Sequence, residues 1–75
     1  MNKARRKWLE NVSEKIAQAK EELEQIMEEE QEAYDNMPES FQDGERGEQM
    51  QENIDNLDIM VSDLEDILEG FYDIQ

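Results

Sequence analysis

The sequence predicts an all-α fold, a long antiparallel helical hairpin of the coiled-coil type, and two observations carry this prediction. Apolar residues recur every three or four positions through two long segments, which is the spacing of amphipathic helices. Between the segments lies the only proline, together with two of the three glycines, residue types that end helices. We therefore predict one hairpin domain over residues 1–75, with helices at 3–36 and 44–72 joined by a turn at 37–43.

The first helix follows a heptad repeat with one polar interruption. Three- and four-residue steps alternate along its apolar positions and are broken only by Glu30, so one stripe of the helix is expected to face a second helix. Trp8, Met27 and Tyr34 lie beside this stripe and widen it. The predicted stripe consists of Leu9, Val12, Ile16, Ala19, Leu23, Ile26, Glu30, Ala33 and Met37.

The turn is predicted from helix-breaking and helix-capping residues. Pro38 ends the first helix, and Asn36 followed three residues later by Glu39 matches a capping box. Because proline is tolerated in a first helical turn, this pattern predicts a short helical segment after Pro38. Asp43 is the expected N-cap of the second helix, since its side chain can accept a hydrogen bond from the first turn.

The second helix carries a heptad stripe and a further apolar column. The stripe consists of Met50, Ile54, Leu57, Val61, Leu64, Leu68 and Phe71. The further column is Met60, Ile67 and Ile74, which is more apolar surface than one neighbouring helix can cover. At about 1.5 Å per residue the helices span roughly 50 Å and 43 Å, so they can pair along their length. We expect two hairpins to form a homodimer, a four-helix bundle.

Charge divides the chain into a basic head and an acidic body. From Glu21 onward there are twenty acidic residues and one cation, Arg46, a formal charge of -19, whereas Lys3, Arg5, Arg6 and Lys7 precede the first acid. Such a body repels nucleic acid and anionic membranes, so we expect it to bind neither directly. No segment has the length and apolar composition of a signal peptide or a membrane span. We expect a soluble, cytoplasmic protein.

Residue types that support catalysis are scarce. The sequence has no His, Cys or Thr, and its only hydroxyl nucleophiles of the serine type are Ser13, Ser40 and Ser62. Nucleophilic catalysis needs such a group beside a base, and paired carboxylates need an enclosed pocket that a thin hairpin does not offer. We therefore expect a protein that is not an enzyme and that uses no cofactor and no specific metal ion.

The acidic body suggests a surface that binds a protein. Duplex DNA carries about one charge per 1.7 Å, so 45 Å of it holds roughly 26 charges, comparable to the -19 of this body. Carboxylates fixed on helices can therefore act as a decoy for a protein that grips phosphate. The alternative is that the acids are the solvated face of a bundle. The candidate partner-binding residues are Glu14, Glu21, Glu28, Asp35, Glu48, Glu52, Asp55, Ile59, Asp66, Glu69 and Asp73.

Ile59, Trp8 and Phe41 are apolar residues that need separate interpretation. Ile59 lies among acids at an outermost heptad position, where it is either a contact anchor or an ordinary exposed residue. Trp8 adjoins the basic head and is interpreted as a packed cap over the open end rather than a base-stacking residue. Phe41 is expected to fold back over the turn end. The basic head can alternatively contact the acidic body of a second copy.

The middle of the chain resembles a group of short acidic proteins encoded by phages, prophages and mobile elements of Gram-positive bacteria. The resemblance is carried by about 30 residues, from Glu28 through the turn Asn36-Met37-Pro38-Glu39-Ser40-Phe41-Gln42 to Glu45-Arg46-Gly47-Glu48. It implies a setting in which small acidic proteins inhibit host nucleic-acid enzymes or defence nucleases, as DNA mimics or anti-CRISPR proteins. It assigns no role to any residue.

These observations give two functional hypotheses. The first is a non-enzymatic inhibitor that binds a basic nucleic-acid-binding protein of the host cell. The second is a structural or adaptor coiled coil that acts by homo-oligomerisation or by binding a partner helix. The first predicts binding that weakens with salt, and the second predicts sensitivity to changes of Met60, Ile67 or Leu68.

Overall fold

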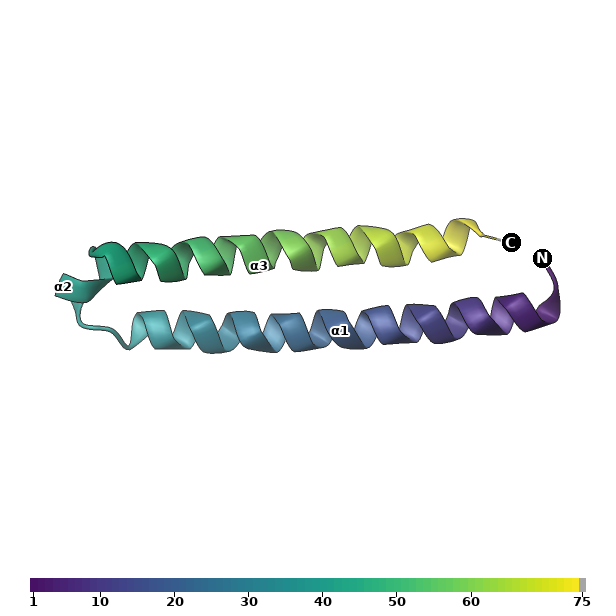
Figure 1. Ribbon diagram of the computed structural model, residues 1–75, viewed down its shortest axis with the longest axis horizontal. Helices are drawn as coiled ribbons and strands as arrows, with labels where there is room; N and C mark the ends of the chain where they lie inside the picture. The colour runs from purple at the N-terminus through teal and green to yellow at the C-terminus, as the bar shows by residue number, and fades with distance from the viewer. Residues whose placement is uncertain (75) are drawn as a thin grey trace.

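The computed structural model describes residues 1–74 and is all-helical. Its elements are α1 (Lys3–Asp35), α2 (Glu39–Gln42), α3 (Glu45–Gly70) and a short 3-10 helix, η1 (Phe71–Asp73). Figure 1 shows α1 and α3 running side by side in opposite directions, with α2 at one end and both chain termini at the other. No strand occurs among the described residues. The all-α class and the pairing of two long helices are confirmed.

A side chain caps each end of α1: one accepts a hydrogen bond at the start of the helix, and another donates hydrogen bonds at its end. At its start the Asn2 side chain accepts a hydrogen bond of 2.8 Å from the Arg5 backbone N–H, which satisfies one of the free donors of a first turn. At its end the Gln42 amide Nε2 donates to the carbonyl oxygens of Tyr34, at 2.9 Å, and Met37, at 3.2 Å. These carbonyls belong to the end of α1 and the turn that follows it, where helical partners are missing.

The predicted capping residues of the turn are wrong in detail. Pro38 is the N-cap of α2 and no side chain caps that helix, so Asn36 and Glu39 do not form a capping box. The N-cap of α3 is Gly44, again without a side-chain hydrogen bond, whereas Asp43 is the C-cap of α2. The short helical segment after Pro38 is present, and it shifts the start of α3 by about one residue from the predicted N-cap.

Gly47 allows the turn to lie directly against α3. It is buried, and a Cβ atom placed on it would lie 2.7 Å from the Gln42 Cα atom, closer than non-bonded atoms approach. The contact brings α2 across the first turn of α3 and positions Gln42 to reach the end of α1. A side chain at this position would therefore force the turn away from the helix.

The face of α3 that packs against α1 is the predicted one, whereas on α1 one column of the packed face differs from the prediction. Every stripe residue predicted on α3 is buried or half-buried. The stripe predicted on the first helix is half-buried at Leu9, Val12, Ile16, Leu23, Glu30 and Met37. Its other three residues, Ala19, Ile26 and Ala33, are exposed, and the positions one residue later, Lys20, Met27 and Tyr34, are half-buried instead. The larger residues bury more apolar surface against α3 than the alanines would. This difference leaves the column of Ala19, Ile26 and Ala33 without a neighbour.

The single hairpin has almost no interior. Val61, 7% exposed, is the only buried hydrophobic residue among those described. Trp8 is 69% exposed and Phe41 is 59% exposed, so neither covers an end of the hairpin as predicted. Ile74 follows η1 instead of continuing the column of Met60 and Ile67 on α3. The molecule is a rod of 59 × 15 × 12 Å between Cα atoms.

The helices of the described part of the chain do not have membrane-spanning character. None combines the length and the apolar composition that a bilayer crossing requires.

Candidate functional site

The predicted partner-binding residues all lie exposed on helices. Those on α1 recur every seventh residue, so each heptad adds one acid to the same side of the helix. Those on α3 and η1 lie on the side away from α1 or on its margin. The set, called the acidic surface below, is Glu14, Glu21, Glu28, Asp35, Glu48, Glu52, Asp55, Ile59, Asp66, Glu69 and Asp73.

The carboxylates of the acidic surface are not paired with cations. The ion pairs among residues 1–74 involve Glu10, Glu24 and Glu65, none of which belongs to this set. The Asp35 carboxylate accepts a hydrogen bond of 3.0 Å from Gln31 one turn earlier. The surface therefore presents helix-mounted negative charge that has no internal counter-ion.

Ile59 lies within the acidic surface. Its side chain is 58% exposed on α3, seven residues from both Glu52 and Asp66. Seven residues are close to two helical turns, so the three side chains leave the helix in nearly the same direction. An apolar group between two carboxylates is available for contact with a partner.

A cation in the groove between the helices was not recognised from the sequence. The Lys20 ammonium lies 3.0 Å from a carboxylate oxygen of Glu24 and 3.4 Å from one of Glu65, which joins α1 to α3. The hydrogen bond with Glu24, assisted by Glu65 and opposed by partial burial, raises the pKa of Lys20 above its ordinary value. The available signal was the four-residue spacing of Lys20 and Glu24 beside the stripe.

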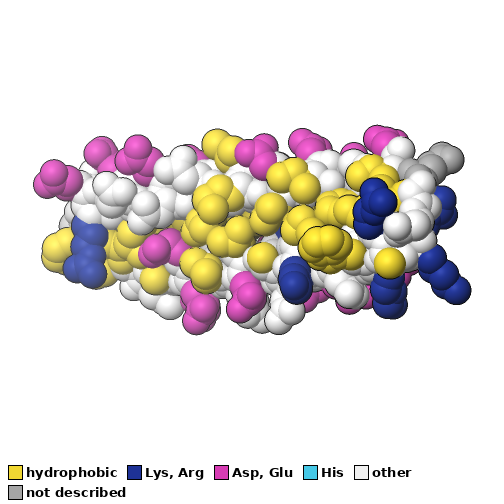
Figure 2. Space-filling model, turned by 45° about the vertical axis from the view of Figure 1, so that its right-hand side comes forward, with side chains coloured by type: hydrophobic (Ala, Val, Ile, Leu, Met, Phe, Trp, Pro, Cys, Tyr) yellow, Lys and Arg dark blue, Asp and Glu magenta, His cyan; other side chains and the backbone are white. Residues whose placement is uncertain are grey.

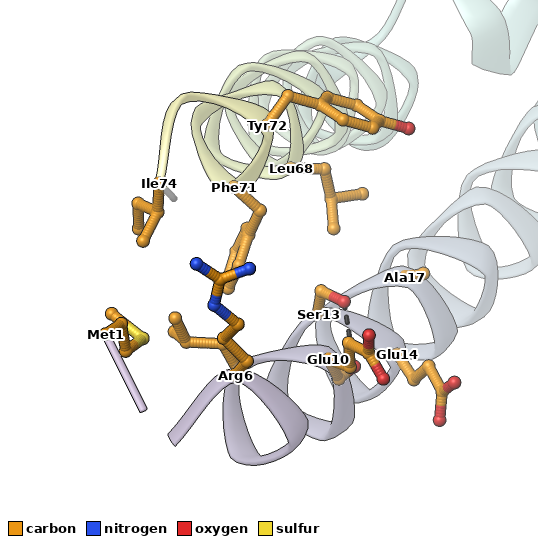
Figure 3. Close-up of a pocket in the computed structure, with 11 residues that line it drawn as sticks. Met1, Arg6, Glu10, Ser13, Glu14, Ala17, Leu68, Phe71, Tyr72 and Ile74 are labelled. Atoms are coloured by element: carbon orange, nitrogen blue, oxygen red, sulfur yellow. Dashed lines mark hydrogen bonds between the residues drawn. The ribbon is translucent and has the colours of Figure 1, made fainter. Parts of the chain in front are cut away.

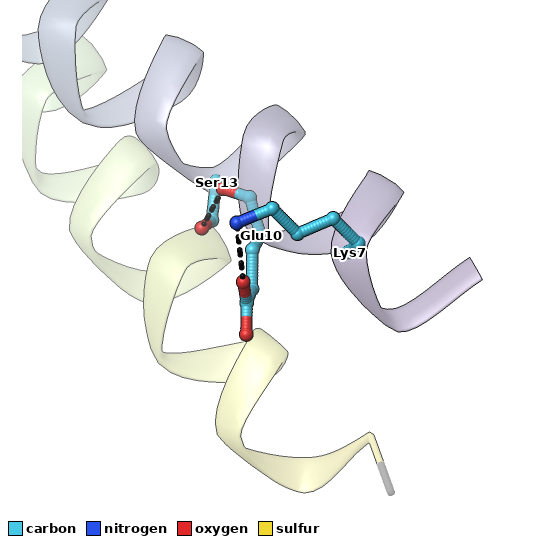
Figure 4. Close-up of polar contacts among 3 residues, drawn as sticks. All are labelled: Lys7, Glu10 and Ser13. Carbon is cyan, nitrogen blue, oxygen red and sulfur yellow. Dashed lines mark hydrogen bonds and ion pairs between the residues drawn. The ribbon is translucent and has the colours of Figure 1, made fainter. Parts of the chain in front are cut away.

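The basic head makes fewer contacts with the acidic body than its charge suggests. Lys7 pairs with Glu10 on its own helix at 3.6 Å (Figure 4). Both side chains are more than two-thirds exposed, and such pairs contribute little to stability. None of the ion pairs between residues 1 and 74 joins the head to α3. The head therefore remains available for other contacts.

A second surface, opposite the Lys20 bridge, is apolar. Ile26 is two residues from Glu24 and Ile67 is two residues from Glu65, which places each about 200° around its helix from the acid that meets Lys20. Trp8 lies eighteen residues, five full turns, before Ile26 and so points the same way. Met60 lies one heptad before Ile67. These four residues, called the apolar face below, are 47% to 69% exposed.

Figure 2 shows hydrophobic side chains gathered in a band along the groove between the two long helices, with acidic side chains along its margins. Basic side chains gather at the end of the molecule that carries the termini. Isolated exposed apolar residues are ordinary, but a contiguous band of this kind is typical of an interaction site. The acidic surface and the apolar face leave the hairpin in different directions, so both can be occupied at once.

A shallow pocket of about 610 Å³ lies at the open end (Figure 3). Leu68 and Phe71 from the α3 side and Ala17 from α1 supply apolar walls, and the Arg6 side chain from α1 lines the pocket beside Phe71. The Ser13 hydroxyl there donates a 2.8 Å hydrogen bond to the Glu10 backbone carbonyl oxygen (Figure 4), and the acids Glu10 and Glu14 line the pocket beside it. The pocket has the walls for an apolar group.

Carboxylates of the described residues do not converge on a point. They form no group of three or more that could hold a metal ion. Helical spacing spreads them along the rod instead, which suits contact with an extended surface.

Comparison of the chain with protein-family models, with curated proteins and with solved structures finds no match. The acidic surface and the apolar face are therefore the features of the molecule that bear on its function.

Proposed function

We propose that this protein is a non-enzymatic inhibitor that binds the basic groove of a nucleic-acid-binding protein in a host cell. The observation that carries the proposal is the acidic surface, an array of unpaired carboxylates on two long helices. A protein that grips phosphate with Arg and Lys recognises closely spaced negative charge. The resemblance to acidic proteins of phages, which include DNA mimics and anti-CRISPR proteins, favours the same function.

The charge per unit length of one copy is close to that of a single DNA strand, which supports a role as a nucleic-acid decoy. A net charge of -15 along a rod of 59 Å is about one charge per 4 Å. A single DNA strand carries one per 3.4 Å and a duplex one per 1.7 Å. One copy thus matches a strand, and it has no bases to be read. The partner is therefore expected to be one that recognises the backbone rather than the sequence.

The decisive experiment is capture of binding proteins from host lysate on the immobilised chain, followed by release with salt and with duplex or single-stranded DNA. We expect a basic nuclease, polymerase or repair protein that is released by both treatments, because counter-ions and phosphate compete for the same Arg and Lys side chains. A partner that resists salt and ignores DNA would contradict the proposal.

A matched pair of variants then tests the position of the charges. Glu52→Gln, Asp55→Asn and Asp66→Asn together neutralise three carboxylates of the acidic surface. The control neutralises Glu22, Glu32 and Asp63, which are also exposed but lie outside it. We expect the first variant to lose at least about tenfold more affinity than the control, although the two have the same net charge. Equal losses would show that only total charge matters.

The exposed apolar face favours a second function, that of a structural or adaptor coiled coil. A hairpin with one buried hydrophobic residue among those described is a marginal fold, and covering this face would supply the missing core. We propose that two hairpins associate through it as a homodimer, forming a four-helix bundle. If a partner helix took this place instead, substitutions at Met60, Ile67 or Leu68 would abolish capture and neutralisation of the acidic surface would not.

A further inference from the structure

We propose that the apolar face binds a second copy of this chain in the opposite direction, so that the basic head of each copy lies on the acidic segment 28–30 of the other. The inference rests on the self-association proposed above and adds its orientation and register. Three features of the hairpin, two on α1 and one on α3, point to the same two-fold axis.

The first feature is a complementary pair of apolar side chains on α1. Trp8 and Ile26 point in the same direction and are about 27 Å apart along the helix axis. Arg5, Trp8 and Val12 line a shallow pocket of about 250 Å³ whose surface is almost entirely apolar. A two-fold axis through the midpoint of Trp8 and Ile26, at residue 17, brings Ile26 of each copy to the pocket beside Trp8 of the other.

The second feature is a pair of opposite charges flanking those apolar residues. Arg5 precedes Trp8 by three residues and Glu30 follows Ile26 by four, so each lies about one turn beyond its neighbour on the same side of α1. Glu30 is half-buried within the apolar stripe, and neither it nor Arg5 takes part in the ion pairs of residues 1–74. Their midpoint lies between residues 17 and 18. The same two-fold axis therefore brings Arg5 of each copy to Glu30 of the other copy, which forms two equivalent ion pairs.

The third feature is on α3. The Lys20 ammonium lies 3.4 Å from a Glu65 carboxylate oxygen. Because the two long helices are antiparallel (Figure 1), Ile67, two residues after Glu65, lies near the height of residues 17 and 18 along the rod. A two-fold axis perpendicular to the rod at this height places Ile67 of one copy against Ile67 of the other. The apolar residue on α3 thus meets its own equivalent where the axis crosses.

The opposite-direction arrangement also separates like charges. In a dimer with both open ends together, the two basic heads would adjoin, and the acidic second half of α1 would cover acidic α3. Reversing one copy stacks α1 on α1 and brings Arg5 and Lys7 to the acids at 28–30, an arrangement in which complementary charges fix orientation.

The overlap is large enough for a specific interface. With the axis at residue 17, residues 3–31 of α1 overlap, about 29 residues or roughly 43 Å. Along a face about 15 Å wide, this covers on the order of 1,300 Å² in the two copies together, within the range of stable protein interfaces. The acidic surface remains outside the overlap on both copies.

Charge reversal tests the ionic pair. Sedimentation equilibrium of the full chain should show a dimer that Arg5→Glu weakens by about tenfold or more. Lys3→Glu makes the same charge change two residues away, on the opposite side of α1, and should weaken it far less. Adding Glu30→Arg to Arg5→Glu should restore the dimer. An equal loss for both single variants, or no rescue, would overturn the register. Circular dichroism at matched concentration confirms that each variant is helical.

Cysteine cross-linking tests the direction, and the chain offers a background without cysteine. Ile67→Cys should form a disulfide between two copies, and a mixture of Trp8→Cys and Ile26→Cys proteins should form the mixed disulfide. If a mixture of Ile26→Cys and Met60→Cys cross-linked instead, the copies would run in the same direction and the inference would be wrong. A chain that is monomeric at all concentrations would overturn the dimer as well. Neither outcome would affect salt-sensitive capture of a basic protein, which tests the inhibitor proposal separately.

Discussion

Gln42 connects the end of α1, the short helix α2 and the start of α3. Its amide donates to two carbonyls that precede α2, and its backbone lies against Gly47 of α3. Hydrogen bonds from a half-buried side chain are costly to lose. Without the amide the Met37 carbonyl loses its Gln42 donor, whereas the Tyr34 carbonyl keeps the backbone N–H of Met37 as a partner at 3.1 Å. One glutamine therefore determines how the two long helices are joined.

Replacement of Gln42 by Glu should destabilise the hairpin by about 1 to 2 kcal/mol, since the two donated hydrogen bonds are lost and a carboxylate faces carbonyl oxygens. Urea unfolding followed by circular dichroism measures the change. Gln49→Glu is the control, because the Gln49 amide makes only an exposed hydrogen bond of 3.2 Å with Asn53. A change at Gln42 no larger than that at Gln49 would show that the amide does not hold the turn.

Lys20 gives the fold a dependence on alkaline pH. Because folding raises its pKa above 10.5, the protonated lysine stabilises the hairpin throughout the range below about 10.5, and this contribution is lost as the pH rises through the folded-state pKa. We expect Lys20→Met to lower the melting temperature at pH 7 relative to Lys15→Met. The difference between these variants should disappear above the folded-state pKa of Lys20. A difference that persisted at high pH would assign the effect to packing of the methylene chain.

At the scale of elements, substitutions of Gly47 and Gly70 test whether α2 packs tightly against α3. Gly47→Ala puts a Cβ atom against the Gln42 backbone, which cannot move without displacing α2, and should cost about 1 to 3 kcal/mol. Gly70→Ala meets nothing within 4 Å at the end of α3 and should be neutral or stabilising by up to about 1 kcal/mol. Thermal unfolding of both variants compares them. Equal effects would show that α2 does not press on α3.

The residues that pack between the two long helices could be predicted better on one helix than on the other. The stripe predicted on the second helix, from Met50 to Phe71, is buried or half-buried as predicted, and the neighbouring column of Met60 and Ile67 is exposed. On α1 two columns compete, and the choice between Ile26 and Met27 was decided by which residues fit against α3. A heptad pattern predicts that a helix is amphipathic. It does not predict which of two adjacent apolar columns packs against the neighbouring helix.

The candidate surfaces were predictable to different degrees. Exposure of the acids follows from their helical spacing, so their positions needed little tertiary information. The turn capping and the Lys20 bridge depend on residues distant in sequence, Gln42 with Tyr34 and Lys20 with Glu65, and local patterns do not show such pairs. Because Lys20 pairs with Glu65 on one side of the hairpin, the apolar face lies on the opposite side.

At the scale of the whole molecule, the proposed dimer would bring the rod closer to duplex DNA in charge density. Two copies offset about residue 17 span about 75 Å and carry a net charge of -30, twice that of one chain. This is about one charge per 2.5 Å, between the values for one DNA strand and a duplex. Self-association and nucleic-acid mimicry would then be parts of one function, because covering the apolar face concentrates the acids on the outside.

The same net charge predicts that salt acts in opposite directions on folding and on partner binding. Repulsion among carboxylates opposes both the hairpin and its dimer, and salt screens it over a distance of about 10 Å at 0.1 M. The melting temperature should therefore rise as sodium chloride is added at pH 7, whereas the affinity for a basic partner should fall. The variant in which Glu22, Glu32 and Asp63 are neutralised should show a smaller rise, since it begins with less repulsion. A melting temperature that fell with salt would mean that attractive pairs such as Lys20 with Glu24 and Glu65 outweigh the repulsion, and that the acidic surface is already compensated within the protein.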